Sequence, residues 1–184
     1  MYKKPHIELL IGCMFSGKST EMIRKLNRYT VAKMKIVVLK WSDDIRIGEN
    51  VEYLQTHGGY KVKCYRVNVL KDFSQWNEYD VIGIDDGQFF PSIEEFSERM
   101  VNQYGKIVII AALDATYARK PFVNITNMIP KCECVRKLDA ICTSCYKKAS
   151  FSYKYDSSVD NDIDIGGHEK YTVLCRKCFF QKSV

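Results

Sequence analysis

One stretch constrains this chain more than any other because it fits the pattern G-x-x-x-x-G-K-[ST]: Gly12-Cys13-Met14-Phe15-Ser16-Gly17-Lys18-Ser19. An apolar run at residues 7–11 precedes it, and residues 20–33 follow with apolar side chains at helical spacing. A strand, a glycine loop and a helix N-terminus in this order form an anion site, in which backbone N–H groups face a phosphate. Lys18 adds a positive charge there, and Ser19 can ligate Mg²⁺. We therefore expect a nucleotide-binding loop rather than a glycine turn that binds nothing.

The composition suits one domain of ordinary size with a small appendage, since the chain has 184 residues and an apolar fraction of 46%. No stretch is long enough to cross a membrane, and the apolar run after Lys3 and Lys4 is too short for a signal peptide. We therefore expect a cytoplasmic protein without membrane partners, whose eight cysteines do not form a disulfide framework. The net charge of +6 suits nucleic-acid binding and equally suits a substrate that carries several phosphates.

Short apolar runs alternate with helical stretches up to about Ala112, which is typical of an α/β fold with a mostly parallel sheet flanked by helices. Strands are expected at four places: residues 7–11, 35–40, 79–85 and 106–112. Pro91 should begin a helix that runs to about Tyr104, and Gly105 should end it. Residues 41–60 are expected to form a loop or a loose hairpin.

A second element of the phosphate site follows the apolar run at residues 81–84, which ends in Asp85 and is followed by Asp86. In P-loop enzymes an acid at such a strand end helps to hold Mg²⁺ beside the loop's Ser or Thr. A strand-terminal Asp is also a common turn former. Given the loop upstream, we expect Asp85 to hold Mg²⁺ together with Ser19. In an extended backbone the side chain of Asp86 points to the opposite face, which leaves it free to act as a base.

The C-terminal part contains two matched cysteine pairs, which are separated by 29 residues: Cys142-x-x-Cys145 and Cys175-x-x-Cys178. Four thiolates form a closed tetrahedral zinc site, which is structural rather than catalytic. The insert is longer than the usual roughly 15–20 residues, and redox pairs or buried thiols are the alternatives. We expect a P-loop domain at residues 1–137 and a zinc-binding, β-rich subdomain at residues 138–184. Cys132 and Cys134 match no motif.

The polar segment between the two cysteine pairs cannot order itself by burial, since fixing its backbone costs about 1–2 kcal/mol per residue. Zinc at both ends would fix the base of this segment, so that its backbone groups could serve as recognition elements. A base such as thymine offers one ring donor between two carbonyl acceptors, which backbone groups can satisfy. Gly166 and Gly167 permit close approach to a ligand, although a plain structural turn would also use them.

Six stretches in order, together with the cysteine pairs, match one known family: residues 14–21, 81–85, 87–91, 111–114, 119–122 and 165–175. On these residues the chain resembles the cytosolic-type (type II) thymidine kinases of animal cells and poxviruses over nearly its whole length. The compact chain is more similar to the poxviral branch.

This resemblance implies transfer of the γ-phosphoryl group of ATP to the 5′-hydroxyl of thymidine, with deoxyuridine also possible, in pyrimidine salvage. It implies Mg²⁺ bound with ATP, a RecA-like P-loop sheet and a zinc-bearing lasso. It also implies a homotetramer and inhibition by the end product thymidine triphosphate. We expect no nucleic-acid partner. Removal of zinc should mainly raise the KM for thymidine, because the lasso loses its anchor.

The resemblance also assigns residues to the two substrates. Beside residues 12–19, the ATP site would include Asp44, Arg46, Asp85 and Gln88. The thymidine site would include Met14, Gln88, Phe89, Tyr117, Phe122, Asp162, Ile163, Asp164, Ile165, Gly166 and Tyr171. Tyr117 stands where relatives typically have Phe, and it adds a hydroxyl that needs a partner.

Asp86 departs from the family pattern, in which the matching residue is the Glu that acts as general base. Asp is one methylene shorter, and misplacement by about 1 Å can cost on the order of 100-fold in rate. Phosphoryl transfer depends mostly on positioning and charge stabilisation, so a slightly displaced or water-bridged carboxylate could still serve. We expect an active, slower enzyme with Asp86 as the base. The alternative is a family member that binds thymidine with weakened catalysis.

Cys13 is a second departure, because relatives usually have Pro after the first loop glycine. A thiol near a helix N-terminus is favoured as the thiolate. We therefore expect Cys13 to react with alkylating agents and to be protected by ATP.

The alternative to a nucleoside kinase is an ATPase that binds nucleic acid through a zinc ribbon. Against it, the basic residues are scattered and no aromatic-basic RNA motif is visible. Stimulation of ATP consumption by thymidine, but not by single-stranded DNA, distinguishes the two. A purely regulatory nucleotide-binding protein would bind thymidine without forming thymidine monophosphate.

Overall fold

The computed structural model describes residues 4–41, 53–55, 61–156 and 164–182. Its main body is a seven-stranded sheet in the order β3-β4-β2-β5-β6-β1-β7, in which only the β3–β4 pair is antiparallel. The strands are β1 (His6–Gly12), β2 (Ile36–Trp41), β3 (Tyr53–Gln55), β4 (Lys61–Val67), β5 (Val81–Asp85), β6 (Ile107–Leu113) and β7 (Cys134–Leu138). The expected α/β class with a mostly parallel sheet is therefore confirmed.

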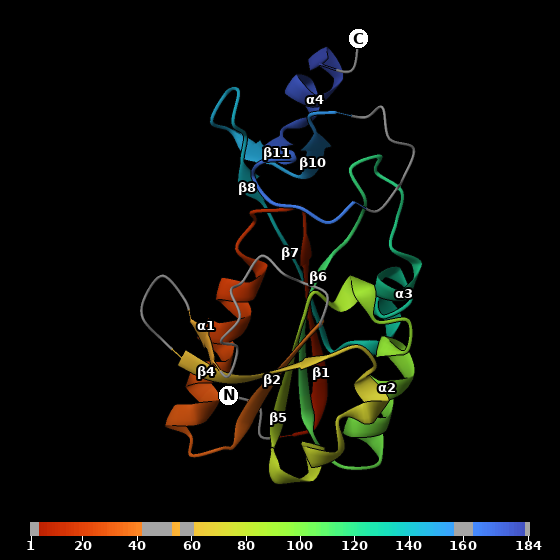
Figure 1. Ribbon diagram of the computed structural model, residues 1–184. Coiled ribbons are helices and arrows are strands. Elements are labelled where there is room, and N and C mark those ends of the chain that lie inside the picture. Colours follow the sequence, from red (N-terminus) through yellow and green to blue (C-terminus); the bar gives the residue numbers. More distant parts are fainter. Residues whose placement is uncertain (1–3, 42–52, 56–60, 157–163, 183–184) are drawn as a thin grey trace.

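Helices cover both faces of this sheet (Figure 1). They are α1 (Lys18–Val31) on one face, and α2 (Ile93–Asn102) and α3 (Val123–Thr126) on the other. Four short 3₁₀ turns complete this part: η1 (Leu70–Asp72), η2 (Ser74–Glu78), η3 (Gly87–Phe89) and η4 (Ile129–Lys131). None of the helices in the described part of the chain combines the length and the apolar character that crossing a bilayer requires.

The four expected strands and the two expected long helices are present, with ends shifted by one or two residues. Most of residues 41–60, which were expected to form a loop or a loose hairpin, lie outside the described residues; β3 within this range pairs antiparallel with β4, which begins at Lys61. Strands β4 and β7 were not predicted. β7 reads Cys-Val-Arg-Lys-Leu and is mostly exposed, so it lacks the apolar run that identified its neighbours.

The core of the sheet places the phosphate loop. Every residue of β1 and β5 is buried, and apolar clusters lie on both faces of the sheet. Helix α1 packs so closely over β5 that a Cβ on Gly83 would lie 2.8 Å from Leu26 Cδ1. The parallel strands β1, β5 and β6 end at one edge, where the loops that follow them meet.

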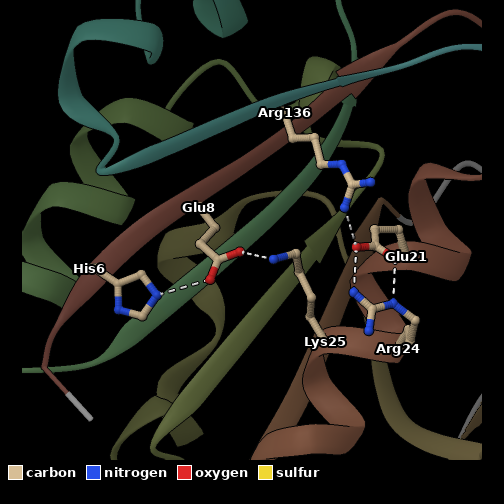
Figure 2. Close-up of polar contacts among 6 residues, drawn as sticks. All are labelled: His6, Glu8, Glu21, Arg24, Lys25 and Arg136. Carbon is tan, nitrogen blue, oxygen red and sulfur yellow. Dashed lines mark hydrogen bonds and ion pairs between the residues drawn. The ribbon is translucent and has the colours of Figure 1, made fainter. Parts of the chain in front are cut away.

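Charged side chains tie α1 to two strands beneath it (Figure 2). Glu8 of β1 lies 2.6 Å from Lys25 Nζ and 3.2 Å from His6 Nε2, and it is only 8% exposed. Glu21 of α1 accepts a hydrogen bond of 3.0 Å from Arg136 in the edge strand β7. The helix that follows the phosphate loop is thereby fixed to β1 and β7 as well as to β5.

A small lobe follows β7 and lies at the carboxyl ends of the strands, at the top of Figure 1. It contains β8 (Ala140–Ile141), β9 (Lys148–Ala149), β10 (Phe151–Lys154), β11 (Tyr171–Leu174) and α4 (Arg176–Lys182). β8 pairs with β9 and β10 with β11, both antiparallel. We call the connection from β10 to β11 the flap; the structure describes its residues 155–156 and 164–170.

Candidate functional site

The phosphate loop runs from the end of β1 to the start of α1. A Cβ on Gly12, which has φ 148°, would collide with the backbone oxygen of Leu138, so this position requires glycine. Gly17 takes a left-handed conformation with φ 79° immediately before the helix. Lys18 Nζ donates a hydrogen bond of 2.7 Å to the Cys13 carbonyl, and burial lowers the pKa of its ammonium. The loop therefore places a largely buried cation at the helix N-terminus, as its sequence predicts.

Ser19 and Asp85 come together as expected from the sequence. The Ser19 hydroxyl donates a hydrogen bond of 2.7 Å to Asp85 Oδ1, and Asp85 is only 2% exposed. Hydroxyl and carboxylate oxygens are the hard ligands that Mg²⁺ prefers. The donor set at this point fits a magnesium ion bound beside the phosphate loop.

Lys40 is a residue of this site that the sequence analysis missed. Its Nζ lies 3.5 Å from Asp85 Oδ2 and 3.4 Å from Asp86 Oδ2, and its side chain is 6% exposed. The expectation that the two carboxylates face apart is wrong. Asp86 is not extended but left-handed, with φ 55°, so both acids converge on one ammonium. The sequence does contain one indication of this role: Lys40 interrupts an otherwise apolar strand, and a buried lysine requires a charged partner.

Gln88 and Phe89 follow Asp86 in η3 and are held by other elements. Gln88 Oε1 accepts a hydrogen bond of 2.9 Å from the Leu113 N–H, and the Asn124 side chain donates to the Gln88 carbonyl at 3.1 Å. The Phe89 ring stacks on Trp41, with centroids 4.7 Å apart. Neither residue belongs to the wall of the pocket described next, so their contact with substrate stays a prediction.

A pocket opens between the phosphate loop, the end of β6 and the flap. It is an open hollow, whose empty space of about 430 Å³ includes solvent at its mouth. Seven residues expected at the nucleoside lie in its wall: Met14, Tyr117, Phe122, Asp164, Ile165, Gly166 and Tyr171. Four further wall residues were not predicted: Leu113, Ala115, Thr116 and Ser152. Asp44, Arg46, Asp162 and Ile163 lie outside the described residues.

Ion pairs fix the flap at the pocket wall. The carboxylate of Asp164 lies 2.6 Å from Lys170 Nζ and 3.0 Å from Lys154 Nζ, and hydrogen bonds from Lys170 and then Lys154 lower its pKa. The Tyr171 hydroxyl donates to the Asp164 backbone carbonyl. Lys154 is 6% exposed, and its Nζ lies 5.2 Å from the ring centroid of Tyr117. These contacts join both ends of the flap to the aromatic wall of the pocket.

The phosphate loop is also attached to the small lobe. The Met14 N–H donates a hydrogen bond of 3.0 Å to Ser152 Oγ, and Cys13 Sγ donates to the Ala149 carbonyl at 3.4 Å. Cys13 is 2% exposed, and burial is the main cause that raises the pKa of its thiol. The expectation of a reactive thiolate at Cys13 is therefore wrong, because the lobe covers the thiol.

The four cysteines of the two pairs come together in the small lobe. One sulfur from each of Cys142, Cys145, Cys175 and Cys178 lies within 4.8 Å of all the others. The Sγ atoms of Cys145 and Cys175 are 3.6 Å apart. A zinc–sulfur distance of about 2.3 Å gives a tetrahedron with edges of about 3.8 Å, so the cluster fits zinc. Burial opposes ionisation of Cys142, but backbone hydrogen bonds within the two knuckles outweigh it and lower its pKa to about 6.

The segment Cys132-Glu133-Cys134 has a structural explanation. The Glu133 carboxylate accepts a hydrogen bond of 2.7 Å from the Ile7 N–H, and Cys132 Sγ donates to the Met128 carbonyl at 3.0 Å. This segment leads into β7 and docks it against β1.

Known proteins match this chain over the residues that form the site. A family model described as thymidine kinase matches residues 5–179. Curated thymidine kinases of vaccinia virus (strain Western Reserve) and monkeypox virus are each 50% identical over 175 residues, which is 95% of this chain and 96% of each relative. The thymidine kinase of variola virus is 49% identical over the same length and the same shares. The matched region includes the phosphate loop, the pocket and the cysteine cluster.

Proposed function

Because the chain belongs to the thymidine kinase family, we propose that it transfers the γ-phosphoryl group of ATP to the 5′-hydroxyl of thymidine. Deoxyuridine is a possible second acceptor, and the reaction serves pyrimidine salvage. The position of Met14 supports this most directly, since Met14 belongs to the phosphate loop and also to the pocket wall. A nucleoside in the pocket would therefore lie next to the phosphates of a bound ATP.

The ATP phosphates would bind at the loop, where backbone N–H groups and Lys18 neutralise their charge. Ser19 and Asp85, which are already hydrogen-bonded to each other, would hold Mg²⁺. When bound, this ion stabilises the charge that develops on the phosphate oxygens. Asp44, Arg46 and Gln88 complete the proposed ATP site.

Asp86 is the proposed general base that accepts the proton of the 5′-hydroxyl. Its backbone is left-handed and its carboxylate lies 3.4 Å from the buried ammonium of Lys40. This contact restricts the side chain of Asp86. The carboxylate can therefore hold a defined position although Asp is one methylene shorter than the Glu of the family. Lys18 would stabilise the negative charge of the transferred phosphoryl group.

The nucleoside would bind between the flap and the aromatic wall, in contact with Met14, Gln88, Phe89, Tyr117, Phe122, Asp162, Ile163, Asp164, Ile165, Gly166 and Tyr171. Zinc on the four cysteines would fix the base of the flap. We propose residues 1–137 as the P-loop domain and residues 138–184 as the lasso. We also propose a homotetramer that is inhibited by thymidine triphosphate.

A coupled kinase assay with thymidine, deoxyuridine and deoxycytidine tests this function, with single-stranded DNA as a further addition. Thymidine should stimulate ATP consumption and yield thymidine monophosphate, whereas DNA should have no effect. Stimulation by DNA alone would instead support the ATPase that binds nucleic acid. Thymidine binding without product would support a weakened family member.

A further inference from the structure

In the described part of the flap, one ring stacks on a ring of the phosphate loop. The ring of His168 stacks on that of Phe15, with centroids 3.7 Å apart and an angle of 9° between the planes. Both residues are exposed, and Phe15 keeps 37% of its surface accessible. The stack therefore lies at the surface and does not belong to the hydrophobic core.

The backbone of Phe15 supports a specific role for this contact. Phe15 has φ 58°, a left-handed conformation that a bulky residue adopts only when its surroundings enforce it. Backbone strain of this kind concentrates at functional sites. The stack on His168 is one contact that holds the ring of Phe15 in place.

The two residues of this contact belong to the phosphate loop and to the flap. Phe15 follows Met14, which lies in the wall of the nucleoside pocket. His168 lies two residues after Gly166, which forms part of the same wall. The phosphate loop and the flap thus meet beside the pocket.

We propose that His168 is a positioning residue, which latches the flap to the phosphate loop through Phe15. This inference rests on the proposed function, because it takes the loop as the ATP site and the pocket as the thymidine site. Phosphates that hold the loop in its left-handed form favour the stack, and the stack holds the flap over the nucleoside. Binding of ATP and binding of thymidine then favour each other by the same factor.

The latch is separable from the general attachment of the lobe. The lobe also holds the loop through Ser152 with Met14 and through Ala149 with Cys13. Loss of the His168 ring should therefore leave the lobe docked. It should change only the coupling between the two substrates.

The test measures the Kd of thymidine by calorimetry, with and without Mg²⁺ and a non-hydrolysable ATP analogue. The wild type is compared with His168→Ala, with His168→Phe, which keeps a ring, and with Tyr155→Ala. Tyr155 is a matched control on the flap, 58% exposed, and no ring stack is found for it among the described residues. The analogue should tighten thymidine binding to the wild type, to His168→Phe and to Tyr155→Ala.

In His168→Ala the tightening should shrink by about 2- to 10-fold, which corresponds to the strength of one ring pair. Equal coupling in His168→Ala and the wild type would overturn the proposal. So would a wild type without coupling, or a His168→Phe variant that behaves like His168→Ala. Turnover of thymidine by the wild type tests the proposed function separately, because the latch is judged only from binding.

Discussion

The sheet and the small lobe differ in how they bury apolar surface. In the sheet, β1 and β5 are buried along their whole length and two large apolar clusters fill the space under the helices. In the lobe, the strands have two to four residues, and the buried cluster is small and includes Cys142. Cys13 of the phosphate loop belongs to this same cluster. The sheet can thus be stabilised by packing alone, whereas the lobe needs its cysteine cluster and the loop beneath it.

The largest expected effect comes from removing the zinc that we propose for the lobe, by Cys175→Ser or by a strong chelator. Structural zinc contributes about 10–16 kcal/mol of apparent free energy in zinc-finger peptides. Loss of the flap's anchor should lower kcat/KM for thymidine by about 100-fold or more. The KM for ATP should rise as well, because the lobe holds the phosphate loop through Ser152 and Ala149.

Steady-state kinetics, metal analysis and far-UV circular dichroism measure this prediction together. Cys134→Ser is the matched control, because Cys134 is exposed and outside the cluster. Unchanged thymidine affinity after verified loss of zinc would contradict the proposed role of the lobe.

The second prediction concerns chemistry at the edge of the sheet and leaves the lobe intact. Asp86→Asn should lower kcat by about 100- to 10,000-fold, the usual contribution of a general base. The Kd of thymidine should change little, because Asp86 is absent from the pocket wall among the described residues. Asp86→Glu is the control and should match or exceed the wild-type rate. Rapid-quench kinetics measure the step, and a fully active Asn variant would exclude Asp86 as the base.

The third prediction tests the packing of the sheet. Leu26→Ala should destabilise the protein by about 2–5 kcal/mol, because Leu26 of α1 is fully buried against Gly83 of β5. Val31→Ala in the same helix is the control; Val31 is 85% exposed, so its loss should change stability by less than about 0.5 kcal/mol. Urea unfolding measures both. An equal loss of stability in the two variants would show that packing of α1 on the sheet does not determine the stability of the protein.

The smallest expected effect is on the alkylation rate of Cys13, which lies at the boundary between the sheet and the lobe. Burial raises the thiol pKa of Cys13, of Cys64 to about 11 and of Cys132 to about 12, so at pH 8 these thiols stay protonated. Alkylation followed by mass spectrometry should label the exposed Cys134 first and Cys13 slowly, with or without ATP. Chelation, which loosens the lobe, should speed the labelling of Cys13. Rapid labelling of Cys13 in the zinc-loaded protein would mean that the lobe does not cover it.

Local patterns predicted what local physics determines. The phosphate loop, β1 and β5 are each encoded within a few residues, by glycines or apolar runs, and each half of the cysteine cluster is encoded by one Cys-x-x-Cys pair. The residues that were missed depend on tertiary contacts. Lys40 shows its role only when β2 lies beside β5, and Ser152 only when the lobe docks on the loop.

Two expectations are wrong, one for Asp86 and one for Cys13. Asp86 was treated as extended, but the chain leaves β5 through a left-handed residue at this position. For Cys13, a place near a helix N-terminus predicts a reactive thiolate, but β9 and β10 of the lobe cover the thiol. Nothing in the residues around Cys13 indicates its burial, because distant segments cover it, whereas the left-handed form of Asp86 is one that Asp adopts more readily than most residues.

The most direct test of the account is a crystal structure with thymidine and a non-hydrolysable ATP analogue. We expect the thymine ring between Tyr117 and Tyr171, under the flap, with its 5′-hydroxyl directed at the γ-phosphate on the phosphate loop. A base bound elsewhere, or a triphosphate away from residues 12–19, would contradict the account.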